Sequence, residues 1–183
     1  MRIIAGRARG MRLGTVPEGT RPVADRAREG LFSSLGDRVP GARVLDLFAG
    51  TGALGLEALS RGADHATFVD KSYGAAAAIH DNLRRTKLGP ADVVTSDALA
   101  FVGRTDKRTG PFDLVFVDPP YEVEGSDLHL LLQRLAGAWV PASGWTVALT
   151  RGKGSSTPVI PVDWVLARRL TYGDSLVFLY REV

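Results

Sequence analysis

The stretch that most constrains the fold is Val44–Gly55, in which a short apolar run ends in a glycine loop and a helical pattern follows. The run is too short for a helix and is bounded by glycine, so it predicts a buried strand. Gly50 and Gly52 allow a sharp turn and the close approach of a ligand, because they carry no Cβ. The helix that begins near Ala53 directs its free N–H groups at this loop. The arrangement is typical of a nucleotide-type cofactor site at the end of the first strand of an α/β sheet.

The glycine spacing alone does not identify the cofactor. Gly50, Gly52 and Gly55 match the pattern of dinucleotide-binding loops, and Asp70 follows Gly50 by 20 residues. A carboxylate at that place would hold the ribose hydroxyls of NAD and of S-adenosylmethionine alike. Asp46 and a second motif, Asp-Pro-Pro-Tyr at 118–121, favour S-adenosylmethionine, because a nicotinamide enzyme has no use for either. A tight strand–helix turn without a ligand is the alternative, and the coincidence of three glycines with two carboxylates argues against it.

Composition places the chain among globular proteins. It has 183 residues, of which 45% are hydrophobic and 23% charged, which predicts one domain with at most a small appendage. An apolar stretch of about 18 residues is absent, so no membrane span is expected. The N-terminus lacks the apolar core of a signal peptide. The chain has no cysteine, which excludes disulfides, thiolate metal sites and cysteine nucleophiles. A cytoplasmic enzyme is the simplest interpretation.

Positive charge is concentrated at the N-terminal end. Residues 1–43 carry nine arginines against four acids, whereas the rest carries 14 basic and 16 acidic residues. A basic arm on a slightly acidic body predicts a polyanionic partner, and arginine pairs bidentately with phosphate. Solvated surface charge is the alternative. The candidate RNA-binding residues are Arg2, Arg7, Arg9, Arg12, Arg26 and Arg28.

The rest of the chain alternates between strand and helix patterns, which predicts a Rossmann-like, doubly wound, mostly parallel sheet. Residues 1–20 are expected to form a small basic β-hairpin arm, which must lean on the body or become ordered on binding. Residues 21–183 form the main domain, which opens with a helix over 24–35. The strands expected next are Arg43–Phe48, Ala66–Asp70, Val93–Ser96, Leu114–Val117 and Thr146–Leu149, with a closing antiparallel hairpin of Trp164–Leu170 and Leu176–Tyr180. The helices expected between them are Ala53–Arg61, Tyr73–Lys87 and Leu128–Ala138.

Four predicted strands end in acids, and ligands of open α/β sheets lie beyond the C-terminal ends of the strands. Asp70 would accept the ribose hydroxyls, and Asp97 an exocyclic amine of adenine. Asp46 would lie near the methionine part of S-adenosylmethionine. The other cofactor candidates are Phe48, Ala49, Gly50 and Gly52 in the loop, and Lys71 and Ala98 beside the two acids. His65, His80 and His129 are isolated, so no metal site is predicted.

Asp118, Pro119, Pro120 and Tyr121 are the candidate catalytic residues. Two prolines remove N–H donors and fix φ, so the segment is expected to be a stiff corner whose carbonyl oxygens are unpaired. The amino group of a base is a poor nucleophile, because its lone pair is delocalised into the ring. Asp118 and the Pro119 carbonyl could accept its two hydrogens and stabilise the positive charge that develops on nitrogen. Tyr121 could stack on the base. A proline-terminated strand with an ordinary turn is the alternative.

The chain resembles the S-adenosylmethionine-dependent methyltransferases that modify exocyclic amino groups. More narrowly, it resembles the bacterial 16S ribosomal RNA guanine-N2 methyltransferase family. The likeness includes Arg2–Gly6, residues 20–29, the glycine loop, the Asp-Pro-Pro-Tyr motif and Tyr172–Ser175. It implies a seven-stranded sheet whose last strand is antiparallel, with Thr20, Arg21 and Pro22 covering the cofactor. It also implies guanine N2 in the assembling small ribosomal subunit as the target, and a monomeric enzyme is expected.

Three other functions remain open. An amino-directed DNA methyltransferase, acting on N6 of adenine or N4 of cytosine, would need the same pocket chemistry. A nicotinamide-dependent oxidoreductase could use the glycine loop, and a basic RNA-binding module could retain the fold without activity. The intact motif at 118–121 counts against the last two. A target base would have to leave its stack to reach the pocket.

Overall fold

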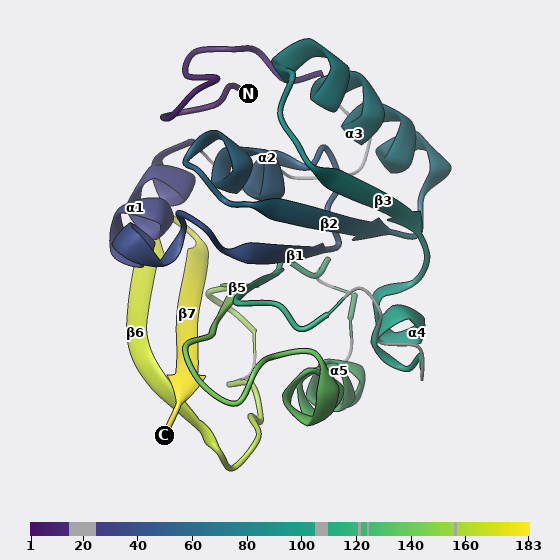
Figure 1. The fold of residues 1–183 in the computed structure, drawn as a ribbon. Coiled ribbons are helices and arrows are strands. Elements are labelled where there is room, and N and C mark those ends of the chain that lie inside the picture. The colour runs from purple at the N-terminus through teal and green to yellow at the C-terminus, as the bar shows by residue number, and fades with distance from the viewer. Residues whose placement is uncertain (15–24, 105–109, 121, 124, 156) are drawn as a thin grey trace.

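The structure is a computed structural model, and it describes residues 1–14, 25–104, 110–120, 122–123, 125–155 and 157–183. Helices and strands alternate along most of the chain (Figure 1). In chain order they are α1 (Asp25–Leu35), the 3₁₀ helix η1 (Gly36–Arg38), β1 (Arg43–Leu47), α2 (Ala53–Ser60), β2 (His65–Asp70), α3 (Tyr73–Thr86), β3 (Ala91–Thr95), α4 (Ala98–Val102), β4 (Leu114–Val117), α5 (Gly125–Ala138), β5 (Thr146–Gly152), β6 (Trp164–Tyr172) and β7 (Ser175–Glu182).

The strands form one seven-stranded sheet in the order β3-β2-β1-β4-β5-β7-β6. The pairs from β3 to β5 are parallel, whereas β7 runs antiparallel to both β5 and β6. This confirms the predicted doubly wound sheet with an antiparallel last strand. After β3 the chain returns to the other side of β1, so the direction of winding reverses between β1 and β4. Open α/β sheets bind their ligands at such a switch point.

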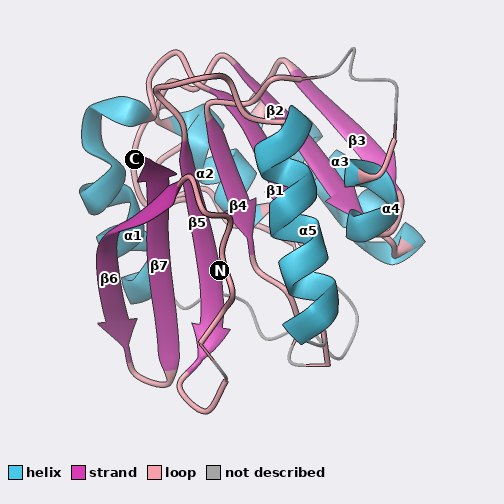
Figure 2. Ribbon diagram, turned by 90° about the horizontal axis from the view of Figure 1, so that it is seen from below, coloured by secondary structure: helices cyan, strands magenta, loops and turns pink. Residues whose placement is uncertain are grey.

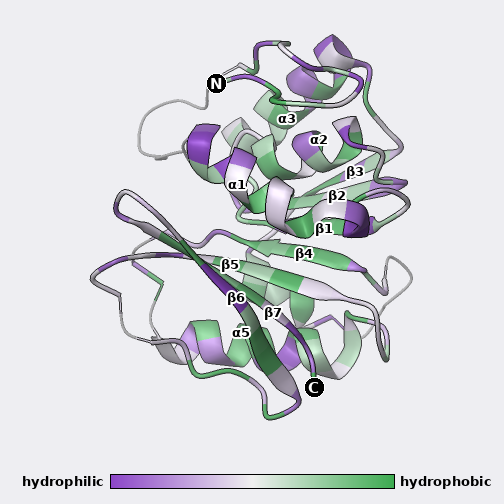
Figure 3. Cartoon of the chain, turned by 90° about the vertical axis from the view of Figure 1, so that its left-hand side faces the viewer, coloured by the Kyte–Doolittle hydropathy of each residue, from purple (hydrophilic) through white to green (hydrophobic). Residues whose placement is uncertain are grey.

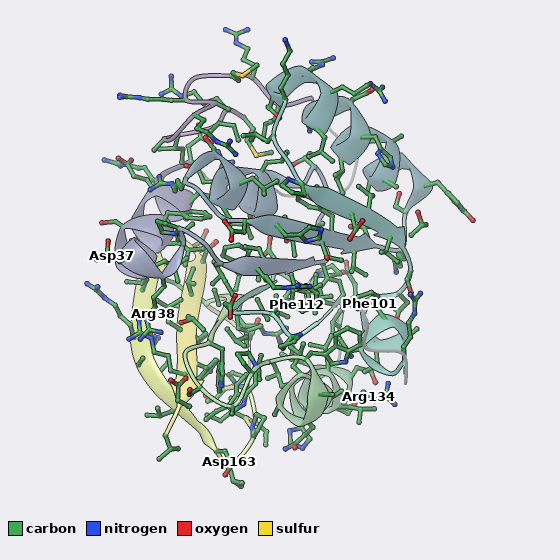
Figure 4. All side chains as sticks on the ribbon, in the orientation of Figure 1. Asp37, Arg38, Phe101, Phe112, Arg134 and Asp163 are labelled. Atoms are coloured by element: carbon green, nitrogen blue, oxygen red, sulfur yellow. The ribbon has the colours of Figure 1, made fainter. Side chains whose placement is uncertain are left out.

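Helices cover both faces of the sheet. Figure 1 shows α1, α2 and α3 on one face and α4 and α5 on the other, and Figure 2 views the sheet from the α5 side. The central strands β1, β4 and β5 are almost entirely buried, and their residues are mostly hydrophobic (Figure 3). Their side chains point to both faces of the sheet, so each face has its own apolar core. On the α5 side, Phe101 and Phe112 lie between the sheet and the helices (Figure 4) and pack their rings against Trp139. The two layers fix the loops at the strand ends.

The N-terminal segment, residues 1–14, packs on the outside of α2. Arg2 and Arg12 form one antiparallel bridge, and the side chains of Ile3, Ala8 and Leu13 are buried in the core of that face. Gly6 lies so close to the end of α2 that a Cβ would approach the Ser60 carbonyl oxygen to 1.8 Å. The described part of the predicted 1–20 arm therefore leans on the body, and the boundary at residue 20 lies outside the described residues.

The bounds of several elements differ from the predicted ones. Helix α4 has no predicted counterpart, because five residues are too few to show a helical period. Strand β5 continues to Gly152, since Thr150, Arg151 and Gly152 pair with β7. That partner is distant in sequence, so the local pattern does not reveal the extension. Strand β3 begins at Ala91 instead of Val93.

Candidate active site

The glycine loop leaves β1 at the switch point of the sheet. Phe48 has a φ of 59°, a left-handed value that costs a side chain about 1–3 kcal/mol and is concentrated at functional sites. Gly50 and Gly52 also have positive φ, and Gly52 caps the N-terminus of α2. The loop is held to the neighbouring strand by a hydrogen bond from the Ala49 amide to the Val69 carbonyl. The predicted turn is therefore present and fixed in position.

The three glycines of the loop have different surroundings. Among the described residues, a Cβ on Gly50 would meet nothing within 4 Å, so this position is open toward that part of the chain. A Cβ on Gly55 would lie 2.3 Å from a ring carbon of Phe68 on β2, so this glycine lets α2 pack closely on the sheet. Gly52 is intermediate, with a nearest approach of 3.1 Å to the same ring. The open position is where a ligand could approach the backbone, as the sequence predicts.

Asp46 lies in the centre of the site, on β1, with only 1% of its surface exposed. Its carboxylate accepts a hydrogen bond of 2.9 Å from the Gly55 amide in the first turn of α2. Burial raises the pKa of Asp46 well above its ordinary value, and the Gly55 amide opposes this. The carboxylates of Asp118 and Asp70 raise it further. Three of the four acids predicted to share one edge of the sheet are therefore brought close enough for the charges of Asp118 and Asp70 to act on Asp46.

Asp70 ends β2 and connects the glycine loop to helix α3. One carboxylate oxygen accepts from the Gly50 amide at 2.8 Å and the other from the Ser72 amide at 2.9 Å. Each oxygen keeps a second lone pair for a ligand hydroxyl. Ser72 in turn caps α3 by accepting from Ala75. Lys71, between them, is exposed.

Asp97 follows β3 and caps α4, with its carboxylate accepting from the Ala100 amide at 2.9 Å. Ala98 begins α4 and is buried. A cavity of about 120 Å³ opens beside the cap, and its lining comes from the glycine loop, α4 and the α5 region. The lining residues are Phe48, Asp97, Leu99, Val123, Asp127 and Leu131. A mainly apolar cavity with two carboxylates at its wall, Asp97 and Asp127, suits a planar base with an amino group.

The cavity lining includes four residues that the sequence does not single out, namely Leu99, Val123, Asp127 and Leu131. Leu131 lies in the predicted helix Leu128–Ala138, whose apolar pattern predicts a core position, whereas Leu99 lies in α4, which has no predicted counterpart. Val123 and Asp127 belong to no motif. Only the packing of α5 against α4 brings them to the glycine loop. No local signal in the sequence could have found them.

Asp118, Pro119 and Pro120 follow β4 directly, next to the glycine loop across the switch point. Burial raises the pKa of Asp118 to about 6, and a hydrogen bond from the Thr150 side chain opposes this rise. The expectation that the proline carbonyls are unpaired is wrong for Pro120, whose oxygen accepts from the Val123 amide at 3.2 Å. The chain turns back there to begin α5, and a turn satisfies that carbonyl. Tyr121 lies outside the described residues.

The site can be compared with known proteins. The family model described as Conserved hypothetical protein 95 matches residues 1–181. Ribosomal RNA small subunit methyltransferase D of Escherichia coli (strain K12) is 36% identical over 186 residues, covering 100% of this chain and 90% of that protein. The protein of the same name from Haemophilus influenzae is 32% identical over 189 residues, covering 100% and 94%. This chain belongs to the small subunit methyltransferase D family.

Solved structures agree with this membership of the methyltransferase D family. The Escherichia coli protein YhhF superposes with a TM-score of 0.87 at 36% identity, covering 100% of this chain and 98% of that one. The superposition therefore covers the parts of this chain that hold the glycine loop, the acids at the strand ends and the proline corner. It includes the antiparallel β7, which distinguishes this sheet from the six parallel strands of dinucleotide-binding folds.

The predicted RNA-binding arginines of this chain differ in their exposure to solvent. Arg2, Arg7, Arg9, Arg12 and Arg26 are exposed. The prediction for Arg28 is wrong, because its side chain is fully buried. It donates from Nη2 to the Arg2 carbonyl oxygen at 2.7 Å and to the Asp25 carboxylate at 2.6 Å. Arg28 sits on the inner face of α1, which a count of arginines cannot show, and it holds the N-terminal segment.

Three cofactor candidates, Thr20, Arg21 and Pro22, lie outside the described residues. Within the described parts of the chain, no three or more metal-ligating side chains gather at one place. The described helices include none that is long and apolar enough to cross a membrane.

Proposed function

We propose that this protein transfers a methyl group from S-adenosylmethionine to the exocyclic N2 amine of a guanine in 16S ribosomal RNA. Its relatives in Escherichia coli and Haemophilus influenzae are named ribosomal RNA small subunit methyltransferase D, which supports ribosomal RNA as the substrate class. The observation that carries the choice of donor is the gathering of three carboxylates at one edge of the sheet, where the charges of Asp118 and Asp70 repel that of the buried Asp46.

A cationic ligand relieves this repulsion, because an opposite charge nearby favours the ionised form of a carboxylate. S-adenosylmethionine carries a sulfonium and an ammonium group, whereas NAD brings an anionic pyrophosphate to the same loop. Asp70 would accept the ribose hydroxyls, since both of its oxygens are already oriented by backbone amides. The adenine base of S-adenosylmethionine would lie in the cavity between Phe48 and Leu99, with its amino group at Asp97. The described residues therefore fit the donor better than they fit a dinucleotide.

The acceptor base would lie at the proline corner. Asp118 and the Pro119 carbonyl would accept the two amine hydrogens, which directs the nitrogen lone pair at the methyl group and stabilises the developing positive charge. Tyr121 would stack on the base, a contact worth about 1–3 kcal/mol in single-stranded nucleic acid complexes. Methyl transfer needs in-line placement of donor and acceptor more than acid–base catalysis.

RNA would be held by the N-terminal segment and by Arg26. Arg2, Arg7, Arg9 and Arg12 are exposed on a surface that is fixed to α2, so their charges are presented together. Phosphate contacts of this kind position an RNA, and its shape supplies much of the recognition. We propose that a monomer acts in the cytoplasm on the assembling small subunit.

The decisive experiment is nucleoside mass spectrometry of 16S ribosomal RNA from a strain that lacks the protein. The expected result is the loss of one N2-methylguanosine, which returns when purified protein and S-adenosylmethionine are added to subunits from that strain. An unchanged RNA together with lost N6-methyladenine or N4-methylcytosine in DNA would establish the alternative DNA methyltransferase. Calorimetry adds an independent check, because binding of NAD without binding of S-adenosylmethionine would exclude methyl transfer altogether.

The arginine surface is tested by replacing Arg7, Arg9 and Arg12 together with alanine. RNA binding should weaken and its logarithmic dependence on salt should flatten, by a slope of about 0.7 for each phosphate that the variant no longer neutralises. A matched control replaces Arg168 and Arg169, which are exposed on β6 at the far edge of the sheet. If the triple variant keeps the salt slope of the wild type, the N-terminal segment is not the contact surface.

A further inference from the structure

A single buried side chain joins the glycine loop to the N-terminal segment. Asn82, in the third turn of α3, has no exposed surface. Its side-chain oxygen accepts from the Gly14 amide at 2.8 Å, and its side-chain nitrogen donates to the Thr51 carbonyl at 3.0 Å. Its partners lie 68 and 31 positions away in the sequence, so the two bonds join three distant parts of the chain.

Each partner of Asn82 belongs to an element with a ligand-binding role under the proposed function. Thr51 lies between Gly50 and Gly52, at the turn that would receive the methyl donor. Gly14 ends the described N-terminal segment, which carries four exposed arginines. Asn82 itself is buried, so it has no surface for RNA.

The N-terminal segment has a second attachment that does not involve Asn82. Glu57 accepts from the Ile4 and Ala5 amides at 2.7 and 3.0 Å, and Ser60 accepts from the Ala8 amide at 3.0 Å. These contacts hold the segment to the last turns of α2, away from the glycine loop at the start of that helix. Removing Asn82 would therefore free the Gly14 end of the segment and leave the rest attached.

A buried amide whose two ends are both satisfied by backbone groups is costly to replace, because each abandoned partner stays unpaired. That cost would stabilise the fold in any case. The particular consequence here is that a shift of Thr51 must strain the bond to Asn82 or move Gly14 with it. Coupling between two sites needs such an element, whose arrangement both sites bias.

We propose that Asn82 is a positioning residue that couples the glycine loop to the N-terminal segment, so that the methyl donor and RNA bind cooperatively. The coupling rests on the proposed function for its two ligands. Donor binding would fix the loop, and through Asn82 it would hold the Gly14 end of the arginine-bearing segment in place for RNA. By linkage, RNA would tighten donor binding by the same factor.

The first test follows the segment without any RNA. Hydrogen exchange of the amides of residues 3–14 is measured in the intact protein with and without S-adenosylhomocysteine. We expect exchange at Gly14 and its neighbours to slow at least fivefold in the wild type and to be unaffected by the ligand in Asn82→Leu. Leucine fills the space of the amide and offers neither hydrogen bond. An equal response in both proteins would overturn the proposal.

The second test measures the coupling factor directly, as the ratio of dissociation constants for isolated small subunits without and with S-adenosylhomocysteine. We expect the ligand to tighten binding about five- to tenfold in the wild type, within the usual range for coupled sites. The ratio should fall below about twofold in Asn82→Leu and in Gly14→Pro, which removes the N–H that donates to Asn82 and replaces neither Asn82 nor Thr51. Gly14→Pro keeps the test valid if the leucine variant does not fold.

Thr86→Val is the matched control. Thr86 lies one turn further along α3 and donates to the Asn82 backbone carbonyl at 2.7 Å, so its replacement removes a buried hydrogen bond without touching the bridge. It should keep the wild-type ratio, and a fall there would mean that α3 acts only through its stability. A wild-type ratio below twofold with both ligands bound overturns the coupling. Failure of either ligand to bind the wild type would instead contradict the proposed function.

Discussion

Asp70 and Asp118 occupy equivalent places on the two sides of β1, yet their surroundings differ. Val69 on β2 and Val117 on β4 both pair with Leu47, so the two aspartates follow at the same level of the sheet. Asp70 accepts from two backbone amides, which belong to the glycine loop and to the start of α3. Asp118 is partly buried beside prolines, which have no N–H, and its partner is the side chain of Thr150.

The difference indicates how one sheet edge can serve two tasks. Two backbone N–H groups hold the Asp70 carboxylate in one orientation, so it stays a hydrogen-bond acceptor throughout the reaction. A residue that binds the methyl donor needs such a constant orientation. Asp118 has a pKa raised to about 6, so its ionised form is less stable than that of an ordinary aspartate and is stabilised by a nearby positive charge. A carboxylate in that condition gains most from a group that becomes positive during the reaction. We therefore propose that the β2 side binds the cofactor and that the β4 side carries out methyl transfer.

The largest expected effect separates the two aspartates. Asp118→Ala should lower the single-turnover rate of methyl transfer by about 10²–10³, the usual reduction when one group that stabilises transition-state charge is removed. The dissociation constant for S-adenosylmethionine, measured by calorimetry, should change by less than about twofold.

Asp70→Ala should show the opposite pattern, with weaker cofactor binding and a near-normal rate at saturating donor. Loss of cofactor binding in the Asp118 variant would contradict the proposed role of Asp118 in methyl transfer and would indicate a role in cofactor binding.

The next effect concerns the packing that holds the cofactor side. Gly55→Ala would push a methyl group into the buried ring of Phe68, and such overpacking costs about 1–3 kcal/mol. For a chain of this length, the melting temperature should fall by about 2–4 °C per kcal/mol. Gly137→Ala on α5 is the control, because a Cβ there meets no atom of the residues that the structure describes within 4 Å, and alanine favours a helix. Equal melting temperatures for both variants would show that α2 can move away from the sheet.

Local sequence patterns predict the parts of the molecule that depend on neighbours in the chain. The apolar run of β4, the glycine turn and the acids at the strand ends follow from residue type and spacing, and the structure brings Asp46, Asp70 and Asp118 together. The packing of distant elements against each other could not be predicted. The burial of Arg28 depends on how α1 faces the N-terminal segment, and the lining by Leu99 and Leu131 depends on how α4 meets α5.

The smallest expected effect tests the Thr150 hydrogen bond through pH. Protonated Asp118 lacks the negative charge that would stabilise the positive charge developing on the amine nitrogen, so kcat/KM for S-adenosylmethionine should fall as the pH drops through about 6. Thr150→Val keeps the shape of the side chain and removes the hydrogen bond that lowers the pKa of Asp118. The midpoint should therefore move to higher pH, by about one unit if the bond has the usual strength of one to a charged group.

A second threonine of β5 supplies the control for this shift. Thr146 is buried, and its hydroxyl has no hydrogen-bond partner among the described residues, so Thr146→Val should leave the midpoint unchanged. The link between protonation and folding predicts the direction of a second effect, the pH dependence of stability. Because folding raises the pKa of Asp118, the folded state binds more protons than the unfolded state between about pH 4 and 6, and stability from this group should rise as the pH falls through that range. In Thr150→Val, the pH dependence of stability should extend to higher pH. If the midpoint is unchanged both in the stability measurements and in the pH profile of kcat/KM, Thr150 does not act on Asp118.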